Sequence, residues 1–151
     1  MSDQFMAAMQ AWIEVFMRRS MHNFIHYAKR KGYSMSQINT LFHIHRHGTC
    51  GVTDVAEHLG ISNAAASQLL ERLVQQKMVL RTEDPVDRRN KRIILTEEGR
   101  QTVAESIHAR QAWIIDLQAK LDQTEKDQVI AALEVLTTKI SLLEKLPEHD
   151  C

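Results

Sequence analysis

The sequence predicts a mostly α-helical fold with one small β-hairpin, in which long helices flank a compact central region. Three observations predict it. Apolar residues recur at helical spacing through most of the chain, and glycines and aromatic residues are few. Two short apolar runs, at 78–80 and 93–95, flank a polar loop that contains Pro85. A length of 151 residues fits one domain, residues 1–151, with a core of its own.

The first helix is predicted from about Asp3 to Lys31, and Gly32 is expected to end it. Its apolar residues follow the helical repeat at Phe5, Met9, Trp12, Phe16, Phe24 and Tyr27. A helix of this length would be roughly 40 Å long, more than a small domain covers. The stripe is either core or a subunit interface, and its breadth and methionine content favour the interface.

Two shorter helices are expected next. Ser34 or Ser36 can cap the first, which carries Ile38 and Leu41 on its apolar face. Thr53 is expected to cap a short third helix that ends before Gly60.

A fourth helix is expected from Asn63 to about Lys77, capped by Ser62. Since a short glycine-containing turn joins it to the third helix, the pair has the helix-turn-helix arrangement. Its inward face is predicted to contain Ala66, Leu69, Leu70 and Leu73. The opposite face is short and polar, which would let the helix approach base edges closely.

The loop between the two strands carries cations at its return, among them Arg88, Arg89 and Lys91. A hairpin with arginines at its tip suits a DNA minor groove. After the hairpin, Thr96 is expected to cap a long helix that reaches about Leu121. Thr124 and Asp127 form a cap-like pair for a last helix, which Pro147 is expected to end. Long helices are therefore expected on both sides of the helix-turn-helix and its hairpin.

The formal net charge of zero argues mildly against nucleic acid as a partner. Charge is unevenly distributed, however, because the acidic excess lies after residue 115 and the cations cluster in the hairpin. A DNA-binding protein needs only a local positive face. No apolar run approaches about 18 residues, so no membrane span is expected. The sequence shows no export signal, and Cys50 and Cys151 are too few for a disulfide framework, so we expect a cytoplasmic protein.

Four segments together carry a family resemblance. They are Asp84-Pro-Val-Asp-Arg-Arg89, Leu95-Thr-Glu-Glu-Gly99, Leu59-Gly-Ile-Ser62 and Arg72-Leu-Val-Gln-Gln-Lys-Met-Val-Leu-Arg81. With the order of elements, they make the whole chain resemble the MarR family of winged-helix transcriptional regulators. The resemblance implies a homodimer that binds a pseudo-palindromic operator in double-stranded DNA, usually as a repressor, and is released by a small-molecule effector. It implies a winged helix-turn-helix flanked by long dimerisation helices, with the DNA-binding region at 34–99 and the dimerisation helices at 1–33 and 100–146.

The expected DNA contacts come from the fourth helix and the hairpin. Asn63 and Gln68 carry the donor and acceptor that suit adenine, and Ala64 can meet a thymine methyl. The resemblance places the hairpin as the wing, with Asp87 holding its neighbouring guanidiniums by charge-assisted hydrogen bonds; which arginine enters the groove stays open. The predicted set is Ser62, Asn63, Ala64, Ser67, Gln68, Arg72, Asp87, Arg88, Arg89, Asn90 and Lys91.

A small aromatic effector is the expected input, in a cleft between the long helices and the helix-turn-helix. The candidate lining residues are Trp12, Phe16, His22, His26 and Phe42, although plain core is the commoner role of such aromatics. No cofactor is indicated.

Metal- or redox-responsive regulation by the same fold is an alternative. His22 and His26 are spaced i, i+4, as are His43 and His47, but no carboxylate or thiol is near in sequence, so no metal site is assigned. Cys50 lies beside His47 in a turn, where an inert small residue is the simpler interpretation.

The sequence gives little support for two other classes of function. Catalysis is not expected, because the sequence has no nucleotide-binding glycine loop, His-Glu-x-x-His or Gly-x-Ser-x-Gly. The other class is a helical interaction module with a degenerate DNA-binding head. Arg88, Arg89 and Lys91 favour DNA binding instead, because a purely structural hairpin has no need of them.

Overall fold

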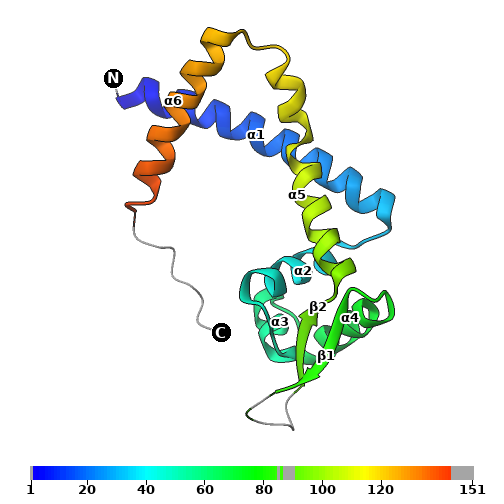
Figure 1. Cartoon of the computed structure of the whole chain (residues 1–151). Coiled ribbons are helices and arrows are strands. Elements are labelled where there is room, and N and C mark those ends of the chain that lie inside the picture. Colours follow the sequence, from blue (N-terminus) through cyan, green and yellow to red (C-terminus); the bar gives the residue numbers. More distant parts are fainter. Residues whose placement is uncertain (1, 85, 87–90, 144–151) are drawn as a thin grey trace. The chain divides into compact units, whose positions relative to one another are not determined.

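The computed structural model describes residues 2–84, 86 and 91–143 (Figure 1). The described part contains helices α1 (Ser2–Lys31), α2 (Met35–His47), α3 (Val52–Leu59), α4 (Asn63–Gln75), α5 (Glu97–Gln118) and α6 (Gln123–Ile140), with strands β1 (Val79–Glu83) and β2 (Lys91–Leu95) between α4 and α5. This confirms the mostly helical class with one hairpin. The chain divides into two compact units, Met1–Gln111 and Ala112–Cys151. Among the described helices, none has the length and apolar character needed to span a membrane.

The core of the first unit lies where α2, α3 and α4 gather around the hairpin (Figure 1). Its fully buried side chains include Leu41, Ile44, Val55, Leu70, Leu73, Val79, Ile93 and Val103. A smaller cluster of Phe24, Tyr27, Ala28 and Ile38 joins the end of α1 to α2. Apolar burial of this kind is the main force that holds the central region together.

The hairpin is fixed to the helices at its base. β1 and β2 pair antiparallel, with Val79 opposite Leu95 and Glu83 opposite Lys91. Ile93 also exchanges two backbone hydrogen bonds with Cys50 in the α2–α3 loop, at 3.1 and 2.8 Å. The base of the hairpin therefore cannot move independently of the helix-turn-helix.

Side-chain caps begin three helices as the sequence predicts. Ser34, not Ser36, caps α2, and Gln37 completes a capping box with it. The Ser62 hydroxyl accepts from the Ala65 N–H at 3.2 Å at the start of α4. The Thr96 hydroxyl accepts from the Gly99 N–H at 3.0 Å and donates to the Lys77 carbonyl at 2.6 Å, which ties α5 to the end of α4.

Three predicted boundaries, from α3 to the end of α5, are wrong. Gly51 is the N-cap of α3, and the Asp54 carboxylate accepts from its N–H at 2.6 Å, so Thr53 lies inside the helix. α4 ends at Gln75 because Lys77 adopts a left-handed conformation with φ of 60° that turns the chain into β1. α5 ends at Gln118, short of Leu121.

The expected caps of α6 are also wrong. Asp122 and Glu125 form its capping box, in place of Thr124 and Asp127. The helix ends at Ile140, so Pro147, which lies outside the described residues, does not end it.

Candidate nucleic-acid interface

α4 has one face in the core and one face in solvent. Ala66, Leu70 and Leu73 are fully buried and Leu69 is partly buried, as the helical spacing predicts. On the other side Ser62, Asn63, Ala64, Gln68 and Arg72 are exposed, and Ser67 is half-buried. The structure thus gathers the predicted α4 contacts on one accessible surface, which we call the α4 outer face. Small and polar side chains on this face leave room for close approach to a nucleic acid.

The start of α4 adds a favourable field for an anion. Ser62 satisfies the Ala65 N–H, and the first-turn amides lie at the positive end of the helix dipole. A phosphate placed there would receive backbone N–H groups as well as the partial positive charge of the helix. The outer face therefore combines an anion-binding end with side chains that can read base edges.

The structure describes only part of the predicted cationic set of the hairpin. Lys91 is exposed at the first residue of β2. Asp87, Arg88, Arg89 and Asn90 lie outside the described residues (Figure 1), so the role expected for each of them stays a prediction.

Asp84 accepts two hydrogen bonds from described residues where the chain leaves β1. This role was not predicted from the sequence. One carboxylate oxygen accepts from the Val86 N–H at 2.8 Å and the other from the Arg92 Nε at 2.6 Å. The Asp84 side chain is only 12% exposed, so this ion pair is better shielded than a typical surface pair. An Asp followed by Pro is a recognisable turn signal and was the available clue.

A second ion pair connects the two candidate DNA-contacting elements. The Arg81 Nη2 on β1 lies 3.1 Å from the Glu71 Oε2 on α4. Both side chains are substantially exposed, so the pair contributes little to stability. Its geometry still restrains the hairpin relative to the α4 outer face.

The five candidate effector residues do not form a single cluster. Trp12 and Phe16 are exposed on α1, with ring centroids 6.1 Å apart. His22 and His26 are exposed further along the same helix, with centroids 4.4 Å apart. Trp12 and His26 are separated by about 21 Å of helix. Phe42 is instead partly buried on α2, against the core.

Phe42 and Phe24 both contact the side chain of Arg110. The Arg110 guanidinium lies 4.0 Å from the Phe24 ring centroid and 4.8 Å from that of Phe42. Burial lowers the pKa of Arg110 from its usual value. Among the described residues, no carboxylate pairs with this cation, whose stabilisation comes from the two aromatic faces.

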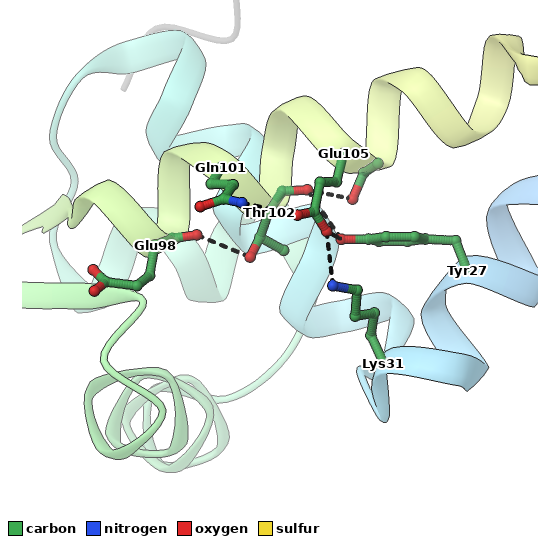
Figure 2. Close-up of polar contacts among 7 residues, drawn as sticks. Tyr27, Lys31, Glu98, Gln101, Thr102 and Glu105 are labelled. Carbon is green, nitrogen blue, oxygen red and sulfur yellow. Dashed lines mark hydrogen bonds and ion pairs between the residues drawn. The ribbon is translucent and has the colours of Figure 1, made fainter.

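A polar cluster joins α1 to α5 (Figure 2). The Tyr27 hydroxyl donates to Glu105 at 3.1 Å, and the Lys31 Nζ lies 2.9 Å from the same carboxylate oxygen. Burial, followed by the Glu105 hydrogen bond, raises the pKa of Tyr27 to about 12, while the Lys31 and Tyr27 hydrogen bonds lower the pKa of Glu105. Gln101 donates to the other oxygen of Glu105 at 3.1 Å. The cluster connects the end of α1 to the helix that follows the hairpin.

The metal and redox candidates can be placed in part. The rings of His43 and His47 are tilted at 45° with centroids 4.6 Å apart, but no group of three or more potential ligands among the described residues is arranged to hold a metal. Cys50 is buried, and its backbone pairs with Ile93, while Cys151 lies outside the described part.

Comparison with known proteins agrees with this geometry. A model of the MarR family matches residues 31–90, from the end of α1 to the hairpin loop. The HTH-type transcriptional repressor MdtR of Bacillus subtilis (strain 168) is 25% identical over 111 residues, which cover 74% of this chain and 72% of MdtR. The uncharacterized HTH-type transcriptional regulator YfiV of the same organism is 30% identical over 115 residues, covering 74% of this chain and 70% of YfiV.

A solved structure shows the same fold. A mutant of S. aureus MepR bound to an oligodeoxyribonucleotide matches with a TM-score of 0.69 and 22% identity, over 87% of this chain and 96% of the MepR chain. Taken together with the helix-turn-helix, the hairpin and the extent of the YfiV match, these similarities show that the chain belongs to the MarR family of HTH-type transcriptional regulators.

Proposed function

We propose that this regulator binds double-stranded DNA as a homodimer at a pseudo-palindromic operator. Residues 34–99 form the DNA-binding region, and residues 1–33 and 100–146 carry the dimerisation helices. The observation that carries the proposal is the exposed α4 outer face beside a hairpin that the Glu71–Arg81 ion pair restrains. The S. aureus MepR mutant, which has the same fold, is bound to an oligodeoxyribonucleotide in its solved structure.

In this proposal, the α4 outer face recognises the bases. Asn63 and Gln68 are exposed amides, and each can donate to and accept from an adenine edge. Ala64 can contact a thymine methyl group, while Arg72 reaches a phosphate or guanine at the far end of the helix. Ser62 keeps its hydroxyl proton available for a phosphate because its oxygen acts as the acceptor from Ala65.

The hairpin contributes affinity that depends little on base sequence. Arg88, Arg89 and Lys91 supply cations for the minor groove and its phosphates, and Asp87 and Asn90 shape the tip. The Asp84–Arg92 ion pair joins the two sides of this hairpin where the chain leaves β1. Arginine is favoured over lysine in a narrow groove because its guanidinium is less strongly hydrated.

Dimerisation explains the apolar side chains that the described chain leaves uncovered. On α1 they include Phe5, Met6, Trp12, Ile13, Phe16 and Met17, and on α6 they include Val129, Ile130, Leu133 and Val135. Apolar surface of this extent marks an interaction site in proteins of this size. A two-fold dimer would place two α4 helices about 34–36 Å apart, one turn of DNA.

The mode of action follows from binding alone, without catalysis. A promoter that overlaps the operator would be repressed, as the name of the MdtR relative indicates for that protein. A small aromatic effector that favours one dimer geometry would release the DNA. Phe42 and the cation above it, Arg110, offer an aromatic and charged contact for such a ligand. A DNA-binding regulator of this kind would act in the cytoplasm.

Selection from a random duplex library tests the proposal. The selected sequences should contain an inverted repeat. Gln68→Ala should change base preference at symmetric positions, whereas Arg89→Ala should weaken binding to all sequences and reduce its salt dependence. Gln75→Ala is the matched control, because this exposed amide lies at the opposite end of α4.

A library without enrichment at moderate salt would exclude sequence-specific DNA binding and favour a protein-interaction role. Equal losses for Gln68→Ala and Arg89→Ala on every sequence would contradict the separate roles given to α4 and the hairpin.

A further inference from the structure

Three histidines meet where α2 packs on α3. His43 of α2 is buried, with 7% of its surface exposed. Its ring stacks on that of His58 from α3 at a centroid distance of 4.2 Å and an interplanar angle of 30°. His47, one helical turn after His43, approaches the same ring at 4.6 Å. We refer to His43, His47 and His58 as the histidine cluster.

The surroundings of the His43 ring favour its neutral form. The Nε2 atom of His43 is buried, and no hydrogen-bond partner for it exists among the described residues. A proton on this ring would therefore create a buried cation with an N–H group that lacks an acceptor, in contact with two other imidazoles. Both the desolvation and the missing hydrogen bond disfavour the charged form.

The charged groups around His43 come from both helices. Arg46 and His47 act on it from α2, and His58 and Asp54 act on it from α3. Burial is the largest cause of a lowered pKa for His43, followed by His58 and His47; Asp54 opposes the shift and Arg46 adds slightly to it. The Asp54 carboxylate alone does not compensate for the burial of His43 and for the repulsion from the like charges around it.

The histidine cluster lies next to the turn that connects α3 to α4. His58 lies in the last turn of α3, immediately before the turn that leads into α4. Gly60 and Ile61 both donate backbone hydrogen bonds to that last turn, and Ser62 then caps α4. A displacement of His58 away from α2 would thus be transmitted to the start of the α4 outer face.

We propose that the histidine cluster is an acid-sensitive joint, in which proton uptake at His43 separates α3 from α2 and weakens DNA binding by α4. The effect on DNA rests on the proposed function. The effect on the α2–α3 contact does not, and it can be measured without DNA.

The direction of the pH effect follows from proton linkage. Since the pKa of His43 is lowered in the folded chain, the unfolded chain, with an ordinary histidine pKa of 6.5, binds the proton more readily. The stabilising effect of neutral His43 is therefore complete above pH 6.5. It is lost as the pH falls below 6.5 and through the folded-state pKa of His43.

Histidine NMR titration is the first test, with chelator present throughout. The His43 ring proton signal should titrate with a midpoint below 6.5, and His58→Gln should move this midpoint upward toward 6.5. His45→Gln is the matched control, because His45 is exposed on the same helix and should leave the His43 midpoint unchanged. A wild-type midpoint of 6.5 or above would overturn the proposal, as would a midpoint that His58→Gln does not move.

DNA affinity is the second test, measured by fluorescence anisotropy at constant ionic strength from pH 8 to pH 5. The probe is the duplex selected at pH 7.5 from the random library. Between pH 6.5 and the His43 midpoint, wild-type affinity should fall by up to about tenfold per pH unit, the limit for one proton. His43→Gln should remove this fall, and His45→Gln should retain it.

The direction of the pH effect on DNA affinity distinguishes the acid-sensitive joint from a general electrostatic effect of histidine protonation. Protonation of exposed histidines adds positive charge and would strengthen phosphate binding at low pH. Wild-type affinity that rises on acidification, or that falls equally in His43→Gln, would contradict the joint. If His43→Gln does not fold, His58→Gln decides the question through a smaller fall than in wild type. If no duplex is selected at pH 7.5, the proposed function fails, while the NMR titration still decides the state of the cluster.

Discussion

The helix-turn-helix with its hairpin and the last helix differ in how they use their apolar residues. Leu41, Ile44, Leu70 and Leu73 are fully buried within one chain. By contrast, α6 has no buried residue, although leucine, isoleucine and valine recur along it. Leu133 is 47% exposed and Val135 is 59% exposed. The first region therefore completes its core alone, whereas the second carries apolar surface suited to a partner.

This difference separates stability of the DNA-binding region from assembly of the regulator. Substitutions in the central core should unfold the chain whatever its concentration. Substitutions on α6 should change the concentration at which two chains associate and leave the helix-turn-helix folded. The first two predictions test these opposite behaviours, and the third concerns the junction between α1 and α5.

Leu70→Ala is expected to have the largest effect. Leu70 is fully buried, so truncation should lower the free energy of unfolding by about 2–5 kcal/mol, which includes the cost of the remaining cavity. Urea unfolding followed by circular dichroism measures the loss. Leu80→Ala is the matched control, because Leu80 is 52% exposed on β1. A loss no larger than in the control would mean that the core is not packed as described.

Leu133→Ser should act on assembly. Burial of its exposed half in a dimer should contribute about 1 kcal/mol per chain. Two copies then raise the dimer dissociation constant by about thirtyfold. Sedimentation at several protein concentrations measures the change, with Gln128→Ser, on the exposed surface of α6, as the control. If the variant unfolds the helix-turn-helix while association is unchanged, the comparison between the two regions is wrong.

Tyr27→Phe should have the smallest effect. It removes the hydrogen bond to Glu105 but leaves the Lys31–Glu105 pair, so the expected loss is about 0.5–1.5 kcal/mol of stability. Tyr33→Phe is a suitable control, since no hydrogen bond of the Tyr33 hydroxyl is present among the described residues. Urea unfolding measures both variants. Indistinguishable midpoints would show that the α1–α5 cluster does not stabilise the fold.

Periodic patterns predicted the fold better than local capping signals did. The core face of α4 and the caps Ser34, Ser62 and Thr96 were accessible because apolar spacing and side-chain chemistry both mark them. Thr53 was mistaken for a cap because a threonine inside a first turn looks the same in sequence. The true arrangement uses a glycine backbone and the carboxylate of Asp54, which only the chain geometry decides.

The candidate site was predictable where it lies on a helix. The exposed face of α4 follows from the helical repeat once the core residues are known. The Asp84–Arg92 and Glu71–Arg81 pairs were not predicted because they join residues on different elements, and their pairing depends on strand register. The stacking of His43 on His58 was missed for the same reason: the i, i+4 spacing shows only His47.

Hydroxyl-radical footprinting of the selected duplex, combined with the sedimentation mass of the complex, tests the central claim most directly. Two chains per duplex are predicted, with two protected major-groove regions about one helical turn apart on one face of the DNA. Arg89→Ala should weaken protection of the flanking minor grooves more than that of the major-groove regions. One chain per duplex, or a single protected region, would contradict the account.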